Sequence, residues 1–141
     1  SVADIFDPTG SSLPFTAWVW LLPGTRGVSA AEFHIVFPSN VIAGNVTCNP
    51  PFIGCYGPPD TIAFGRCLTD WDWGVKVECV LTDSNPSSIV LVPHPGESSV
   101  LIATCEPGNP LEPAIVFNRL SLNFWDAAEP VSWGAIKSLY R

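Results

Sequence analysis

The chain has 141 residues, of which 47% are hydrophobic and 13% charged, so a disordered chain is excluded and one domain with a substantial core is expected. The net charge is −7 with only six Lys and Arg residues, which argues against a nucleic-acid partner and against an anionic membrane surface. No apolar run reaches the roughly 20 residues that a membrane-spanning helix needs. Fifteen prolines and eleven glycines favour many short strands joined by turns.

The first residues and the cysteines indicate where the protein works. A chain that begins Ser-Val-Ala-Asp, without any methionine, is typical of a mature protein after signal-peptide removal. We therefore expect a secreted protein, extracellular or at the cell surface, in which some of the five cysteines form disulfides. Asn45, in Asn45-Val46-Thr47, is a candidate for N-glycosylation, although a bacterial secreted protein would usually leave it unmodified.

The chain opens with a short apolar segment, residues 1–7. Its apolar side chains are Val2, Ile5 and Phe6, and Pro8 ends it. We interpret residues 1–8 as a first strand or as an arm that pairs with the edge of a sheet.

Residues 15–22 predict a strong strand whose two faces are both apolar. Two tryptophans on one face of a single strand form a large apolar surface. Packing in the core is the favoured interpretation, and contact with another subunit or with a ligand is the alternative. One face carries Phe15, Ala17, Val19 and Leu21, and the other carries Thr16, Trp18, Trp20 and Leu22.

Residues 28–41 predict one half-buried antiparallel strand, in which Phe33, Ile35 and Phe37 alternate with polar positions and Val36. A sheet-edge position is expected for residues 88–92, because prolines follow directly. About nine strands in all predict an all-β fold, an antiparallel β-sandwich of jelly-roll or immunoglobulin-like type over residues 1–128. The remaining strands are expected at 41–47, 61–67, 75–81, 88–92 and 99–104, with one long or two short strands over 113–124.

The cysteines differ in their surroundings. Cys48 and Cys55 enclose a tight loop with two prolines, and a disulfide between them would stabilise the fold by roughly 2–3 kcal/mol. Metal binding is the alternative, but no second cysteine pair lies nearby. Cys79 shares the inward face of residues 75–81 with apolar side chains, so we predict a buried free thiol.

The last part of the chain, residues 129–141, predicts a linker and an aromatic tail. Trp133, Ile136, Leu139 and Tyr140 fall at helical spacing, with cations near the C-terminal end, where they favour a helix. Nine residues cannot hold a helix alone in water, so the tail must dock on something. It can dock on its own sandwich, dock on another subunit, or act as a sorting or anchoring signal.

Two resemblances bear on the family. Gly27-Val-Ser-Ala-Ala-Glu-Phe-His-Ile35, followed by Phe37-Pro-Ser-Asn-Val41, resembles the opening of cohesin-like domains, which are nine-stranded jelly-roll sandwiches of extracellular bacterial proteins. The same opening, together with Phe64-Gly-x-Cys67 and Trp133-Gly-x-Ile-Lys-x-Leu-Tyr-Arg141, is similar to a group of uncharacterised secreted bacterial β-sandwich proteins. That second resemblance implies a Cys67–Cys105 disulfide, which closes about 38 residues and contributes roughly 4 kcal/mol. The competing pairing is Cys67–Cys79 across a hairpin.

Little in the sequence points to catalysis. The two histidines, His34 and His94, have no adjacent acidic or cysteine partner, and no nucleophile-elbow, phosphate-loop or zinc-protease motif is present. We expect no enzyme, no cofactor and no metal site.

The polar turn of residues 70–74 is the candidate ligand face. Trp71 and Trp73 can stack on sugar rings while Asp70 and Asp72 bind hydroxyl groups or calcium, although no spaced calcium loop follows. The alternative is a hairpin loop whose tryptophans cap the sandwich.

The sequence predicts a structural protein, a subunit that self-assembles into an extracellular filament or surface structure by exchanging a terminal segment. A sheet edge can accept such a segment from a neighbouring copy, which gives a homo-oligomer or polymer. A carbohydrate- or protein-binding module, by analogy with cohesins, is the alternative.

Overall fold

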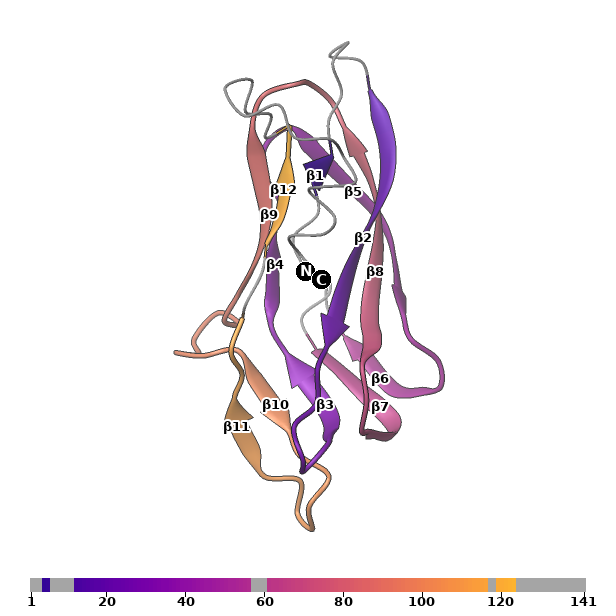
Figure 1. Ribbon diagram of the computed structural model, residues 1–141, viewed down its shortest axis with the longest axis vertical. Helices are drawn as coiled ribbons and strands as arrows, with labels where there is room; N and C mark the ends of the chain where they lie inside the picture. Colours follow the sequence, from indigo (N-terminus) through magenta and orange to yellow (C-terminus); the bar gives the residue numbers. More distant parts are fainter. Residues whose placement is uncertain (1–3, 6–11, 57–60, 117–118, 124–141) are drawn as a thin grey trace.

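The computed structural model describes residues 4–5, 12–56, 61–116 and 119–123, and these contain strands and no helix (Figure 1). The prediction of an all-β fold is confirmed, with more strands than the expected nine. Val2, Phe6 and the tail residues Trp133, Ile136, Leu139 and Tyr140 lie outside the described residues. The strands are β1 (Asp4–Ile5), β2 (Leu13–Leu21), β3 (Val28–Glu32), β4 (His34–Val36), β5 (Val41–Cys48), β6 (Phe52–Tyr56), β7 (Thr61–Leu68), β8 (Asp72–Leu81), β9 (Ser87–Val92), β10 (Leu101–Ala103), β11 (Leu111–Pro113) and β12 (Leu120–Leu122).

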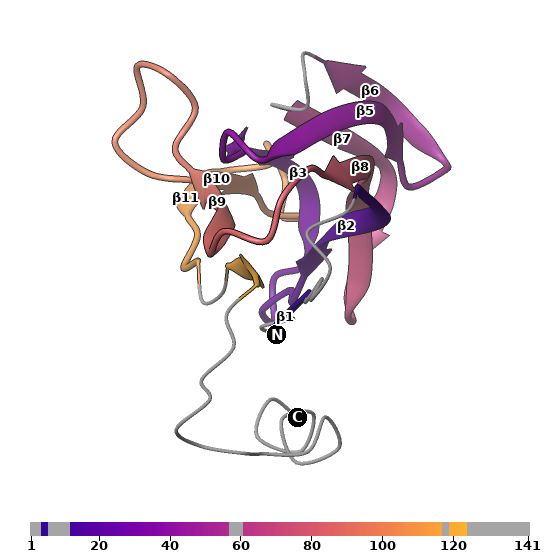
Figure 2. The ribbon, with the colours of Figure 1, turned by 90° about the horizontal axis from the view of Figure 1, so that it is seen from above.

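The strands form three sheets arranged as a sandwich. One sheet has the order β2-β8-β5, the second β1-β12-β9-β4 and the third β11-β10-β3-β7-β6. Figures 1 and 2 show the first two sheets facing each other, while the third lies at one end of the molecule. Neighbouring strands are antiparallel except β1 and β12, which run parallel.

The single strand expected over residues 28–41 is wrong, because the chain changes sheet at Phe33. β3 pairs with β7 and β10, whereas β4 pairs with β9 in another sheet. Phe33 lies between them, and its side chain is buried in the core. Such bends are how a strand turns the corner between two packed sheets.

Three further expectations are corrected or refined. β9 is an inner strand between β12 and β4, and not the sheet edge that was expected. An inner position is possible because Pro93 follows the last residue of β9 and does not interrupt its hydrogen bonds. The loop expected between Cys48 and Cys55 contains most of β6, which pairs with β7. Of the region 113–124, where one long or two short strands were expected, the described residues hold one short strand, β12, and only the last residue of β11.

The core takes its side chains from the inward faces that the alternation predicts. Val75, Val77, Cys79 and Leu81 of β8 are all buried, as expected. On β2, Phe15, Ala17, Val19 and Leu21 pack against this core. The expectation that the opposite face also packs in the core is wrong, because Trp18 and Trp20 of β2 and the following Leu22 are exposed.

Two disulfides cross-link the sandwich, one over a short and one over a long stretch of chain. Cys48 bonds to Cys55 and Cys67 bonds to Cys105, so both predicted pairings are confirmed and the Cys67–Cys79 pairing is wrong. Cys79 is a buried free thiol, and its burial raises its pKa to about 11. Two disulfides are typical of a protein that matures outside the reducing cytoplasm. Within the described ranges, no helix has the length and apolar character that crossing a membrane requires.

Candidate functional site

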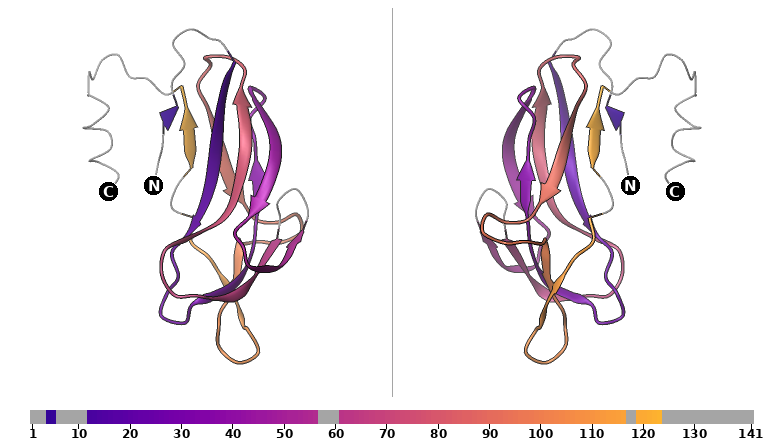
Figure 3. Two further views of the ribbon diagram at one scale, coloured as in Figure 1. Left: turned by 90° about the vertical axis from the view of Figure 1, so that its right-hand side faces the viewer. Right: turned by 90° about the vertical axis from the view of Figure 1, so that its left-hand side faces the viewer.

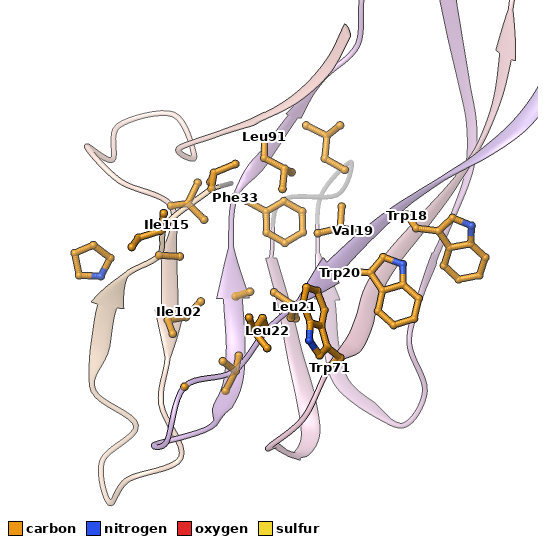
Figure 4. A pocket seen from close by; sticks show the side chains of 18 of the residues that line it. Trp18, Val19, Trp20, Leu21, Leu22, Phe33, Trp71, Leu91, Ile102 and Ile115 are labelled. Carbon is orange, nitrogen blue, oxygen red and sulfur yellow. The ribbon is translucent and has the colours of Figure 1, made fainter. Parts of the chain in front are cut away.

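An apolar groove of about 660 Å³ runs between β2 and strands of the other two sheets. Figure 4 shows Val19, Leu21 and Leu22 on one side of it and Ile102 and Ile115 on the other. β2 supplies one wall, and β9, β10, β12 and residues 112–116 supply the other. The deep part is lined by core residues, among them Phe33, Ile35, Val77, Leu91 and Val100. The groove therefore opens directly onto the hydrophobic core.

Exposed apolar side chains gather around this groove. Of the twelve large hydrophobic residues that are exposed in the described part of the chain, six line the groove. Exposed apolar side chains that share one groove mark an interaction site more often than scattered surface residues do. The six are Trp18, Trp20, Leu22, Trp71, Ile115 and Val116.

The backbone of β2 adds a second feature to the groove. Among the strands that the structure describes, β2 pairs with β8 alone and is the edge of its sheet. The views in Figure 3 place β2 opposite β1 and β12, the edge of the facing sheet. An edge strand offers unpaired N–H and C=O groups to another segment. The groove thus combines an apolar interior with a sheet edge.

Charged side chains are few in the groove lining. Arg26 forms an ion pair with Glu112 and lies 3.9 Å from a carboxylate oxygen of Glu106. Arg119, directly before β12, is exposed and also lines the groove. The lining is otherwise dominated by apolar residues, so a ligand with a broad apolar face fits it best.

The outer face of β2 and β8 carries a cluster of tryptophans, which extends to the rim of the groove. The rings of Trp18 and Trp73 pack edge to face with their centres 5.3 Å apart. Lys76 Nζ lies 5.3 Å from the Trp18 ring and 5.9 Å from the Trp73 ring, within cation–π distance. Trp20 and Trp71 are 52% and 55% exposed and line the rim.

The predicted ligand turn is built differently from expectation. Asp70 Oδ1 accepts a hydrogen bond from the Trp71 N–H at 2.8 Å, and Asp72 Oδ1 accepts one from the Trp73 N–H at 2.9 Å. Asp72 also accepts hydrogen bonds from Asn49 and from Arg66, each at 2.9 Å. The bond from Arg66 is the main cause that holds the pKa of Asp72 below its ordinary value.

The two carboxylates therefore brace the turn that carries the tryptophans. The described residues contain no group of three or more His, Cys, Asp or Glu side chains placed to hold a metal ion. Trp71 and Trp73 also diverge, since Trp71 lines the groove while Trp73 is half-buried against Trp18.

The remaining sequence candidates lie away from the groove. His34 on β4 is half-buried, and His94 Nδ1 lies 3.0 Å from the carbonyl oxygen of Pro95; neither residue lines the groove. Asn45 is exposed on β5, an edge strand. Ile5 belongs to β1 and lies opposite Leu122 in the backbone register.

Sequence reasoning missed the groove itself. Leu91, Ile102 and Ile115 come from three segments far from β2 in the chain, and only the fold brings them together. One local signal was present, since residues 15–22 were apolar on both faces.

No known protein family matches the sequence. No curated protein matches it, and no solved structure matches the fold. The resemblance to cohesin-like domains and to secreted proteins with a similar tail stays a prediction.

Proposed function

We propose that the protein is a secreted structural subunit, which self-assembles into an extracellular filament or surface structure by docking a terminal segment of one copy on the sandwich of the next. The observation that carries the proposal is the apolar groove beside the free edge of β2. Protein sheets commonly bind partner segments through such edges and grooves. A head-to-tail contact that repeats without closing produces a fibre.

The pairing of β1 helps to choose between the two chain ends. Asp4 and Ile5 pair with Ser121 and Leu122 of the same chain, at the edge of the facing sheet. This supports the interpretation of residues 1–8 as a first strand of its own domain. The C-terminal tail is then the better candidate for the exchanged segment.

The test compares the full chain with a variant that lacks residues 130–141. Negative-stain microscopy and mass measurement at neutral pH are expected to show regular filaments or rings for the full chain and monomers for the variant. Near-ultraviolet circular dichroism would confirm that the variant keeps its tertiary structure. A full chain that stays monomeric at every concentration, or a variant that forms the same assemblies, would contradict the proposal.

The exposed tryptophans favour a second candidate function, a carbohydrate-binding module. Trp20 and Trp71 present large aromatic surfaces to solvent at the groove rim. Such rings can stack on the apolar faces of sugars, and polar groups of the groove lining such as Arg119 can bind hydroxyls.

Retention on insoluble polysaccharides tests this second function. The paired substitution Trp20→Ala and Trp71→Ala should abolish retention, whereas Ile42→Ala, at an exposed position off the groove, should not change it. Failure of the unmodified protein to bind any polysaccharide would exclude this function.

A further inference from the structure

We propose that the apolar groove is the binding site for the C-terminal tail, and that Trp133, Ile136, Leu139 and Tyr140 are the side chains that enter it. This inference rests on the proposed function and names both members of its contact. The shape of the groove is known from the structure, whereas the properties of the tail are inferred from its sequence.

The tail matches the groove only when it is helical. At about 100° per residue, the four apolar side chains fall within an arc of about 120°, the width of an amphipathic stripe. Lys137 and Arg141 fall outside that arc. An extended tail would instead place both cations on the face that carries Trp133 and Leu139. A short amphipathic helix laid in an apolar groove is a common mode of peptide recognition.

Length and burial support the same pairing. A helix of nine residues is about 14 Å long, whereas the nine residues of β2 span about 30 Å, so the helix fits along part of the groove. The exposed side chains of Leu22 and Ile115 lie on opposite walls and would be covered by it. Because so short a helix does not form alone in water, the contact would also fold the tail.

Charge and chain path add two further arguments. The tail carries Lys137 and Arg141 and no acidic residue, so removing its +2 from the chain's −7 leaves −9 on the rest of the protein. The net negative charge of the sandwich attracts a cationic tail at long range, while the groove lining itself carries two arginines and one glutamate and contributes no net negative charge. The described chain ends at Asn123, directly after β12, whose Leu120 lines the groove. The last described residue thus follows a residue of the groove lining by three positions in the chain.

Direct titration tests the contact. The acceptor is the full chain with Trp133, Ile136, Leu139 and Tyr140 replaced by serine, so that its own tail cannot compete. A fluorescent synthetic peptide of residues 130–141 is titrated into it, with anisotropy as the readout. We expect saturable binding that weakens at least about tenfold when Leu22→Lys and Ile115→Lys are added, because a lysine on each wall opposes apolar contact.

The matched control is the acceptor with Ile42→Lys and Ile53→Lys. These positions are 60% and 77% exposed, against 56% and 77% for Leu22 and Ile115, and they lie off the groove. Binding to the control should stay within about twofold of that to the acceptor. Absence of binding to the acceptor, or equal loss in both lysine pairs, overturns the inference.

Mass measurement on the unmodified full chain separates this inference from the proposed function. Specific peptide binding together with a monomeric full chain would mean that the tail docks on its own sandwich; the groove assignment then stands and self-assembly fails. Assemblies that persist without peptide binding would leave self-assembly standing and overturn the groove assignment.

Discussion

Arg66 Nη2 donates a hydrogen bond to Asp72 Oδ2 at 2.9 Å and thereby joins β7 to β8, two strands that are consecutive in the chain but belong to different sheets. The same arginine donates from Nη1 to the carbonyl oxygens of Pro50 and Pro51. Asp72 in turn accepts from Asn49. This network holds the turn before β8 and so positions Trp71 at the groove rim.

Asp72→Asn should weaken the fold in a pH-dependent way. The pKa of Asp72 is lower in the folded protein than in the unfolded chain, so the unfolded chain is protonated first as the pH falls. The contribution of Asp72 to stability is therefore present above about pH 4 and is lost as the pH falls through its folded-state pKa. Because the pair is one-third exposed, we expect a loss of no more than about 1 kcal/mol at neutral pH. Urea unfolding should show a smaller difference in acid than at neutral pH. An equal difference at both would refute the electrostatic explanation.

Gly27→Ala should destabilise the protein. Gly27 has a φ of 70°, and a Cβ there would lie 2.8 Å from Cys105 Sγ and 3.0 Å from the carbonyl oxygen of Leu68. Steric strain and the clash with the disulfide should together cost about 2 kcal/mol or more. Gly24→Ala is the matched control, because nothing lies within 4 Å of its Cβ position. Urea unfolding midpoints should fall for the first variant only; equal midpoints would disprove the clash.

The Cys79 thiol should not react with thiol reagents in the native state. It is 3% exposed, and burial raises its pKa to about 11, above the value of about 8.5 in an unfolded chain. A thiol reagent should therefore react with one cysteine per chain only after unfolding without reductant. Rapid modification of the native protein would contradict the burial of Cys79.

The Cys79 thiol should also make the free energy of unfolding depend on pH in alkaline solution. The unfolded thiol ionises first as pH rises, so its contribution to stability is lost from about pH 8.5 to 11. Cys79→Val keeps an apolar side chain and should remove this part of the pH dependence. Parallel pH profiles for the protein and the variant would argue against the shifted pKa.

Removing the two disulfides should have unequal effects. Loop entropy assigns about 4 kcal/mol to the Cys67–Cys105 bond and about 2.5 kcal/mol to the Cys48–Cys55 bond, since they close separations of 38 and 7 residues. The paired alanine variants should lower the free energy of unfolding in that order. The opposite order would mean that loop length does not control their contribution.

The sequence could predict the strands but not the site. Alternation at residues 75–81 placed Cys79 in the core correctly, because a side-chain period of two is a local property. The same rule failed at Phe33, where alternation continues while the backbone passes from one sheet to another. Hydrogen-bond partners are set by distant segments, so a local pattern cannot report such a change.

Exposure of the tryptophans could not be predicted for a related reason. Trp18 and Trp20 share a face by their spacing, but whether that face is covered depends on which strands pack over it. The groove depends in the same way on walls that come from both halves of the chain. Local spacing identified the apolar residues correctly and left their neighbours undetermined.

The parallel pairing of β1 with β12 has a mechanical consequence. Asp4 lies opposite Ser121 and Ile5 opposite Leu122, so tension that pulls residues before Asp4 and after Leu122 apart would load this pair in shear. The two-residue strand would yield first, before the longer ladders of the sandwich. The Cys67–Cys105 bond would then prevent the 38-residue stretch that it closes from extending. Under such tension the protein would therefore lengthen by a limited amount.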